Sequence, residues 1–562
     1  MGIVLPIKHK TMKRTFTFLT VTVALVTMHV NAQAPTWSWA KTSGGSSNEE
    51  VIGAWVDASG NSYATGTFSS SSITFGSTTF NNGGGSDYFL TKYDASGNVL
   101  WAKSATGSNN DVGYGVTGDA SGNLYVVGTS NSATLTFGSN TLALHGYDDI
   151  FVVKYDASGN VLWAKSAGGN ANDIGQGICV DGNGNSYITG YFASPNIAFG
   201  STTLVNGGGN DFYETAYDPS GNVLWAKNAG GSSNEEGMGI VADANGNTYV
   251  TGGFSSSSIT FGSTTFNNGG GSDYFLTKYD ASGNVLWAKS AIGSNNDVGY
   301  GVAKDGSGNL YVVGTFNSLS LTFGSTALTL NAYDDIFLVK YDASGNVAWA
   351  KSAGGNANDI GQGIAVGVNG NSFITGYFAS PSLTIGSTTL TNSGTDNTYV
   401  AEYDASGNPL WAKSVGGTSS DRPYTIALDA TGETYVGGYF SSPTVSFGST
   451  VLTNVGGNDL FMAKLLSNGE SVAEENNSGV TLSVLPNPNN GSFDLQINGI
   501  QNASHDAQLS IVDMLGQEVY HSTLNFQNTT NRIELSDLSN GMYCVMVTTG
   551  NRQYNSRVMI NR

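Results

Sequence analysis

The apolar and polar positions of this chain alternate in short blocks. Between residues 112 and 168, four runs rich in apolar and β-branched residues, GYGVTG, LYVVGTS, IFVVKYD and VLWAKSA, are separated by polar turns. Runs of this length and composition predict β-strands. The turn DASGN joins the first run to the second and the third to the fourth. Because its Asp and Gly favour tight hairpins, the pattern predicts a four-stranded antiparallel meander.

The same unit returns along the chain. A tryptophan in the fourth run recurs every 62 residues, at Trp39, Trp101, Trp163, Trp225, Trp287, Trp349 and Trp411. A period of this size is typical of a solenoid, a propeller or a repeat array. The first unit begins with fourth-strand sequence around Trp39, and the last ends with third-strand sequence, NDLFMAKLLSNGE. The N-terminal strand is therefore expected to complete the last sheet.

A ring uses such an offset to join its two ends, whereas a stacked solenoid gains nothing from it. We therefore predict an all-β protein: a seven-bladed β-propeller of 62-residue blades over residues 35–466, closed by the N-terminal strand, followed by a small C-terminal β-sandwich. A usual blade has about 40 to 45 residues. The surplus in each unit, for example SSITFGSTTFNNGGGSD, predicts an extra hairpin that turns at Gly-Ser.

Units such as WAKSAGGNANDIGQGICVDGNGNSYITGYF resemble the SBBP repeat family. This resemblance covers all seven units and implies seven-bladed propellers of secreted bacterial proteins. A second symmetry is visible, because units 1 and 4 share GGSSNEE, units 2 and 5 share GSNNDVGYGV, and units 3 and 6 share GGNANDIGQGI. The repeat therefore resembles a duplicated triplet with one odd unit.

The two ends of the chain differ from the repeat. Residues 1–34 have a basic start, an apolar run and small residues at Ala32 and Ala34, so we interpret them as a signal peptide, with Met1 or Met12 as the start. No apolar run in the mature chain approaches the roughly 20 residues of a membrane-spanning helix. Residues 467–480 are polar and acidic and are predicted to be a linker.

Residues 481–562 carry alternating strands with Gly turns, which predict a small β-sandwich. They resemble the type A C-terminal sorting domain of the type IX secretion system. The positions that carry this resemblance are Pro486, Asn487, Pro488, Gly491, Asp513, Gly516, Gly541 and Tyr543. The resemblance implies a Gram-negative host, export through the type IX machinery as a partner, and a location in the medium or on the outer cell surface.

Composition excludes several function classes. The net charge is -20, which disfavours nucleic acid as a partner. His145 is the single histidine of the repeat region, so neither a His-based zinc site nor a Ser-His-Asp triad is expected there. The two cysteines, Cys179 and Cys544, lie in different predicted domains and form no disulfide framework. We expect a monomer.

A carboxylate precedes each first strand, and the seven are expected to surround one mouth of the central channel. They are Glu49, Asp111, Asp173, Glu235, Asp297, Asp359 and Asp421, with Arg422 beside the last. Such a ring predicts a ligand or cation site, and calcium is one candidate, although no cofactor is firmly implied. The alternative is that these residues cap turns through local hydrogen bonds. No catalytic residue is assigned.

Two other features have competing interpretations. Glu214 stands where the other units have Leu, Val or Met, and is interpreted as a raised-pKa carboxylic acid, an exposed edge residue or drift. Phenylalanines that end the second strand supply either blade core or the floors of binding pockets; they are Phe68, Phe192, Phe254, Phe316, Phe378 and Phe440.

Three functions are consistent with these patterns. The first is a non-enzymatic binding or adhesion module for extracellular polymers or proteins. The second is a secreted hydrolase or lyase that acts on polysaccharide, and the third is a structural surface coat. The residues alone identify neither the ligand nor whether the exported chain stays anchored or is released once its sorting domain has been removed.

Overall fold

The computed structural model describes residues 35–466 and, in the C-terminal region, residues 481–485, 489–498, 507–512, 518–524, 530–535, 538–539, 541–549 and 552–560. Every regular element in these residues is a β-strand, as predicted. Among the same residues, no helix is long and apolar enough to cross a membrane. The predicted signal peptide and linker lie outside the described residues.

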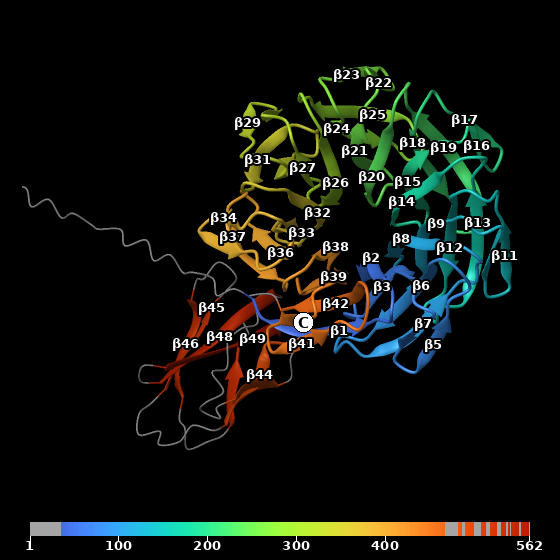
Figure 1. Cartoon of the computed structure of the whole chain (residues 1–562). Coiled ribbons are helices and arrows are strands. Elements are labelled where there is room, and N and C mark those ends of the chain that lie inside the picture. The colour runs from blue at the N-terminus through green and yellow to red at the C-terminus, as the bar shows by residue number, and fades with distance from the viewer. Residues whose placement is uncertain are drawn as a thin grey trace, which may run out of the picture.

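Residues 35–466 form seven four-stranded antiparallel sheets, arranged around a common centre in Figure 1. The innermost strands are β2 (Glu49–Val56), β8 (Asp111–Gly118), β14 (Asp173–Val180), β20 (Glu235–Ala242), β26 (Asp297–Lys304), β32 (Asp359–Val366) and β38 (Asp421–Leu428). Each pairs with a second strand: β3 (Ser62–Phe68), β9 (Leu124–Ser130), β15 (Ser186–Phe192), β21 (Thr248–Phe254), β27 (Leu310–Phe316), β33 (Ser372–Phe378) and β39 (Thr434–Phe440).

The third strands are β6 (Asp87–Tyr93), β12 (Asp149–Tyr155), β18 (Asp211–Tyr217), β24 (Asp273–Tyr279), β30 (Asp335–Tyr341), β36 (Asn397–Tyr403) and β42 (Asp459–Leu465). Six sheets end in a fourth strand from their own unit: β7 (Val99–Ser104), β13 (Val161–Ala167), β19 (Val223–Ala229), β25 (Val285–Ala291), β31 (Val347–Ala353) and β37 (Pro409–Val415). In the remaining sheet the fourth strand is β1 (Trp37–Ser43), which pairs antiparallel with β42, with Ala40 opposite Ala463.

The surplus residues of each unit form the predicted small hairpin. The seven hairpins are β4 (Ser72–Phe75) with β5 (Thr78–Asn81), β10 (Thr134–Phe137) with β11 (Asn140–Ala143), β16 (Asn196–Phe199) with β17 (Thr202–Val205), β22 (Ser258–Phe261) with β23 (Thr264–Asn267), β28 (Ser320–Phe323) with β29 (Thr326–Thr329), β34 (Ser382–Ile385) with β35 (Thr388–Thr391), and β40 (Thr444–Phe447) with β41 (Thr450–Thr453).

Local sequence explains the tight turns between strands. In the first unit, Asp57 accepts hydrogen bonds from the backbone amides of Ser59 and Asn61, both at 2.9 Å. Gly60 has a φ of 75°, a conformation that glycine adopts without steric cost. The recurring tryptophans join neighbouring units, because Trp39 donates from Nε1 to the carbonyl oxygen of Ala95 at 3.1 Å. Turn chemistry therefore shapes each unit, and its tryptophan attaches it to the next.

The C-terminal region has two further sheets. One contains β43 (Thr481–Leu485), β44 (Ser492–Asn498) and β47 (Thr530–Glu534), and the other contains β45 (Ala507–Val512), β46 (Glu518–Leu524), β48 (Gly541–Thr549) and β49 (Arg552–Ile560). Their buried side chains, among them Phe493, Ile511 and Val545, form a core of their own.

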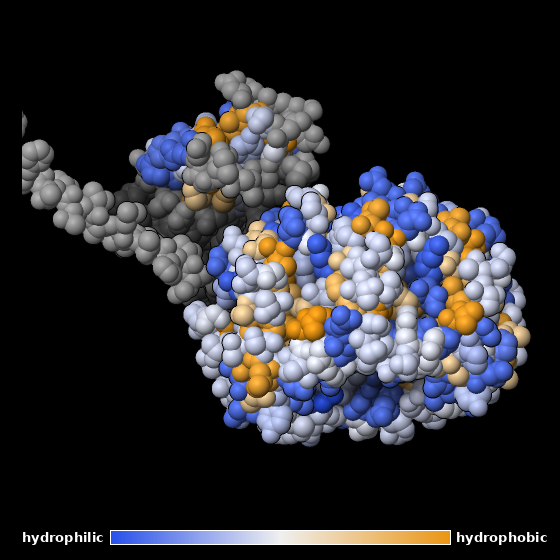
Figure 2. Space-filling model, turned by 90° about the horizontal axis from the view of Figure 1, so that it is seen from above, coloured by the Kyte–Doolittle hydropathy of each residue, from blue (hydrophilic) through white to orange (hydrophobic). Residues whose placement is uncertain are grey.

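The surface of the repeat region is mixed rather than uniformly polar. On the face drawn in Figure 2, polar and apolar residues are interspersed. The exposed apolar side chains include fourth-strand leucines that are about half accessible: Leu100, Leu162, Leu224 and Leu286. Isolated apolar side chains of this kind are normal on soluble proteins.

Candidate functional site

A β-bulge in every innermost strand directs one side chain into a shared cavity. The pairing between first and second strands shifts register at one residue, between Val51 and Gly53 in β2 and between Gly113 and Gly115 in β8, and likewise in the other five. Such bulges turn the extra side chain away from the regular alternation. The seven extra residues all line one cavity of about 560 Å³, which we call the mouth cavity: Ile52, Tyr114, Gln176, Met238, Tyr300, Gln362 and Tyr424.

Glycine after the bulge lets neighbouring inner strands approach closely. A Cβ on Gly53 would lie 2.6 Å from the carbonyl oxygen of Tyr114, and a Cβ on Gly239 would lie 2.8 Å from that of Tyr300. The same segments line a second cavity of about 180 Å³. The inner strands therefore surround a narrow neck that adjoins the mouth cavity.

Glu50 lines the mouth cavity and Glu236 lines a smaller pocket beside it, and each carboxylate has an amide partner. Glu50 accepts from Asn458 Nδ2 at 3.0 Å, and Glu236 accepts from Asn210 Nδ2 at 3.1 Å. Burial raises the pKa of Glu50, although the Asn458 bond and the charge of Arg422 oppose this. When ionised, these two acids disfavour anionic ligands.

Arg422, predicted as a site residue, lies close enough to Glu50 for its charge to act on that carboxylate, and it is already paired. Its Nε and Nη2 donate to Asp396 Oδ2 at 3.0 and 2.6 Å, and its guanidinium lies 4.1 Å from the centroid of the Tyr377 ring. Burial by itself lowers the pKa of Arg422, but the bond to Asp396 more than offsets it, so the pKa is raised. The arginine therefore stays charged and compensates one of the surrounding carboxylates.

Tyrosines supply the aromatic surface of the mouth. They are Tyr114, Tyr300 and Tyr424, and burial, followed by the Asp148 carboxylate, raises the pKa of Tyr114. Burial, followed by Tyr377 and two carboxylates, raises the pKa of Tyr300 to about 12. These phenols remain neutral near pH 7 and can donate hydrogen bonds. Aromatic faces beside carboxylates suit ligands that are polyhydroxylated or positively charged.

The structure buries the seven predicted carboxylates beneath this mouth. Glu49, Asp111, Asp173, Glu235, Asp297, Asp359 and Asp421 are all at most 1% exposed. Asp173 is typical, because it accepts from the backbone and Oγ of Ser194 at 3.0 and 2.7 Å, tying two loops together. Burial raises the pKa of Asp111 to about 7 and that of Asp297 to about 6. A ligand or cation role for this ring stays a prediction.

Strand alternation explains why sequence reasoning missed Glu50 and Glu236. Successive side chains of a strand point to opposite faces, so the first residue of each inner strand packs between sheets and the next one points the other way, as Glu50 does into the mouth cavity. Both glutamates follow directly after predicted site residues in the sequence NEE. The alternation was readable from the sequence, but the bulge that aims Tyr114, Tyr300 and Tyr424 was not.

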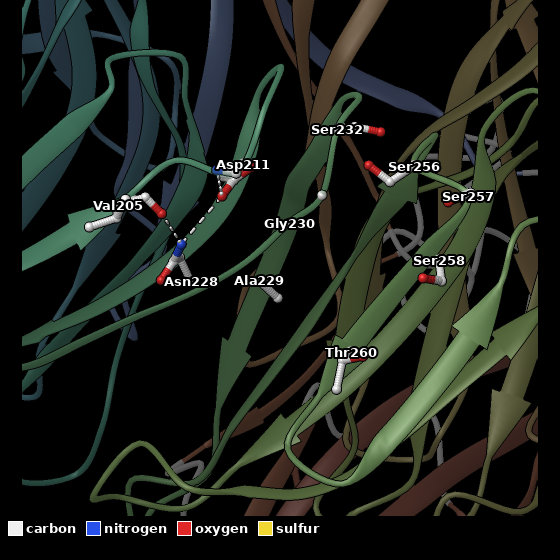
Figure 3. Close-up of a pocket in the computed structure, with 12 residues that line it drawn as sticks. Val205, Asp211, Asn228, Ala229, Gly230, Ser232, Ser256, Ser257, Ser258 and Thr260 are labelled. Carbon is white, nitrogen blue, oxygen red and sulfur yellow. Dashed lines mark hydrogen bonds between the residues drawn. The ribbon is translucent and has the colours of Figure 1, made fainter.

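A third cavity, of about 480 Å³, lies between neighbouring units and is drawn in Figure 3. Asn228 Nδ2 bridges the carbonyl oxygen of Val205 at 3.0 Å and Asp211 Oδ2 at 3.3 Å. Asp211 Oδ1 is buried without a hydrogen-bond partner. Within the described residues, no group of three or more His, Cys, Asp or Glu side chains is arranged to hold a metal ion.

The remaining candidates lie in the core or in the tail. The six phenylalanines that end the second strands are fully buried, which supports the blade-core interpretation, and Glu214 is fully buried as well. In the tail, Gly491 has a φ of 97° and Tyr543 donates to the carbonyl oxygen of Ser539 at 2.9 Å, while Gly541 begins β48. Pro486, Asn487, Pro488, Asp513 and Gly516 lie outside the described residues.

Comparison with protein families finds one match within each of the two predicted parts of the chain. Residues 163–191 match the model of SBBP, a β-propeller repeat, and residues 483–561 match Por_Secre_tail, a secretion system C-terminal sorting domain. The sorting domain indicates export by the type IX secretion system and a secreted or outer-surface location in Gram-negative bacteria of the Bacteroidetes type.

Two curated proteins are distantly similar to this chain. An uncharacterized WD repeat-containing protein of Acanthamoeba polyphaga mimivirus is 26% identical over 68% of this chain. The regulatory protein FlaEY of Caulobacter vibrioides is 26% identical over 59% of it. The alignments span 35% and 38% of the lengths of these relatives.

Solved structures show low overall similarity. The extracellular domain of a one-component system from B. thetaiotaomicron is 9% identical, with 91% of this chain and 74% of that chain covered and a TM-score of 0.20. Synechocystis apocarotenoid oxygenase is 11% identical, with 75% and 94% covered and a TM-score of 0.31.

Proposed function

We propose that this chain is a secreted or surface-displayed binding protein, in which a seven-bladed ring closed by β1 holds an extracellular polymer at its mouth cavity. Two observations support the ring. The N-terminal strand pairs with the last repeat strand, and one residue from each of seven inner strands lines one cavity.

The observation that supports a binding function is that the seven inner strands share one backbone arrangement but project different side chains into the cavity. The residue after each bulge is glycine in six units, whereas the bulge residue itself is Ile, Tyr, Gln or Met. Close approach of the inner strands requires glycine after the bulge, but it does not restrict the side chain that projects into the cavity. A ligand would impose demands of its own, and these would differ from one side of the cavity to the other.

The chemistry of the mouth favours a neutral or positively charged polysaccharide. Tyr114, Tyr300 and Tyr424 offer ring faces, and Gln176 and Gln362 offer amide donors and acceptors. The carboxylates repel anionic polymers, because a cleft of one sign disfavours ligands of the same sign. Binding of a polymer at this single cavity does not require an equivalent pocket in each unit.

A glycan and cell-wall polymer array, probed with the full chain, tests this function. We expect binding to a neutral or amine-bearing polymer, and loss of that binding when Tyr114, Tyr300 and Tyr424 are replaced together by Ala. Leu224→Ser, on an exposed fourth strand, is the control and should bind normally. Silence on the array would contradict the proposal, and release of cleaved product would make the protein a hydrolase or lyase. A parallel run with a chelator tests the predicted calcium role.

A further inference from the structure

The wall of the mouth cavity has a gap in the fourth unit. The penultimate residue of the second strand is Thr67, Thr129, Tyr191, Gly253, Thr315, Tyr377 or Tyr439 in the seven units. Beside Gly253 lies a pocket of about 200 Å³, smaller than the 300 to 1,000 Å³ typical of sites for drug-sized ligands. It therefore has room for one small unit of a larger ligand.

This pocket adjoins the mouth cavity. Met238 and Tyr300 line both spaces, and Glu236 lies in the pocket wall. A Cβ on Gly253 would come within 2.6 Å of Ser272 Oγ and 3.1 Å of Val298. A side chain at position 253 would thus occupy space that the pocket now offers to a ligand.

The first unit shows what the same position looks like when filled. It shares GGSSNEE with the fourth unit, and its equivalent residues are Thr67 and Ser86. Thr67 Oγ1 reaches the carbonyl oxygen of Asp111 at 3.4 Å. Because a threonine fits beside a serine in the sister unit, Gly253 is not required by the fold at this point.

The lining of the pocket combines one acid with apolar and polar groups. Glu236 uses Oε1 to accept from Asn210, and a carboxylate has further lone-pair sites for a ligand. The Tyr300 ring and the Met238 thioether form an apolar wall, and Asn234, Ser255 and Ser272 add polar atoms. We propose that this pocket binds the protonated amino group and adjoining ring of an amino sugar unit, an inference that rests on the proposed mouth function.

An amino sugar matches this lining better than two simpler ligands. A lysine side chain carries only methylenes below its ammonium group, so it would leave the hydroxyls of Ser255 and Ser272 desolvated without a new partner, which is costly. A neutral hexose would satisfy those groups but would leave Glu236 without a counter-charge. The hydroxyls and the ammonium group of an amino sugar meet both needs.

Calorimetric titration of the full chain tests this assignment. The probes are a chitosan oligosaccharide with free amines, the N-acetylated chitin oligosaccharide of equal length, and a lysine-rich peptide, at a pH where the amines are protonated. We expect the free-amine sugar to bind about tenfold or more tightly than its acetylated counterpart, as for a charge-assisted hydrogen bond. Gly253→Thr and Glu236→Gln should each remove this preference.

Gly306→Thr is the matched control, because a Cβ at Gly306 meets no atom within 4 Å. It should keep the preference, and thermal unfolding of all variants checks that they fold. Equal binding of both sugars by the unaltered chain, or a preference that survives Gly253→Thr, would overturn the pocket assignment while leaving mouth binding intact. Preferential binding of the lysine peptide would replace the sugar by a protein ligand. Failure of every probe, together with silence on the polymer array, would remove the proposed function as well.

Discussion

Glu214 should make the protein lose stability as pH rises. It lies in β18, and the equivalent positions hold apolar residues: Leu90, Val152, Leu276, Leu338, Val400 and Met462. Thr248 Oγ1 donates to Glu214 Oε1, whereas Oε2 is buried without a partner in the described structure. Glu214→Leu therefore removes a buried acid and installs the residue that sister units already accommodate.

The size of the effect follows from the pKa. Burial raises the pKa of Glu214 to about 8, from an ordinary value of 4.5. Between these values the folded chain keeps the proton and the unfolded chain releases it, so the free energy of unfolding decreases as pH rises, by about 1.4 kcal/mol per unit. This contribution is fully present below pH 4.5 and is lost by about pH 8. From pH 5 to pH 8.5 the loss is about 4 kcal/mol.

Urea denaturation of the full chain at pH 5, 7 and 8.5 measures this difference. Other titrating groups are common to both proteins, so the stability of Glu214→Leu minus that of the unaltered chain isolates Glu214. We expect this difference to grow by about 4 kcal/mol across the range. Leu276→Met, at the equivalent position of the next unit, should show no such growth. A difference that stays constant with pH would refute the reasoning, because it would mean that Glu214 ionises in the folded state.

Three further outcomes are expected from the packing. Gly239→Val places a side chain against a backbone oxygen 2.8 Å away and should lower stability by about 1 to 3 kcal/mol, whereas a melting temperature equal to that of the unaltered chain would exclude close strand approach. Ser194→Ala removes the 2.7 Å bond to buried Asp173 and should cost about 1 to 3 kcal/mol in urea titrations; no change would mean that water replaces the hydroxyl. Arg422→Leu removes the positive charge that pairs with buried Asp396 and should lower the free energy of unfolding by about 1 to 3 kcal/mol, a modest loss because the arginine is one third exposed. Adding Asp396→Leu should restore most of that stability. If the two substitutions instead lower stability additively, the two side chains are not coupled.

The secondary structure could be predicted from local sequence because it depends on local chemistry. Alternating apolar runs define the strands, and Asp57 and Gly60 show how each DASGN turn closes a hairpin. The extra hairpin and the pairing of β1 with β42 followed from the constant period and from the offset of its ends. Each of these inferences needed only residues within one unit or the comparison of one unit with the next.

Only part of the candidate site could be predicted from the sequence in the same way. The acidic residues that begin each inner strand are visible in the sequence, as is Arg422, whose bond to Asp396 could not be predicted from it. Whether Glu49 or Glu50 faces the mouth depends on strand register, since one residue of slip exchanges the two faces. The glycines on both sides of Tyr114 are visible in the sequence, but they do not by themselves show that a bulge turns Tyr114 inward, because glycine within a strand also marks close approach of another backbone.

The sequence by itself determined the strands, their turns, the 62-residue period and the sorting tail, because these are encoded in contiguous residues. Tertiary structure alone decided which carboxylates are buried and which are open to a ligand. It also decided that the missing side chain at Gly253 becomes a pocket, because that space is bounded by Ser272, Val298 and Tyr300, which follow it by 19, 45 and 47 residues. Burial and cavities are properties of neighbours brought together by folding, and no single stretch of the chain contains them.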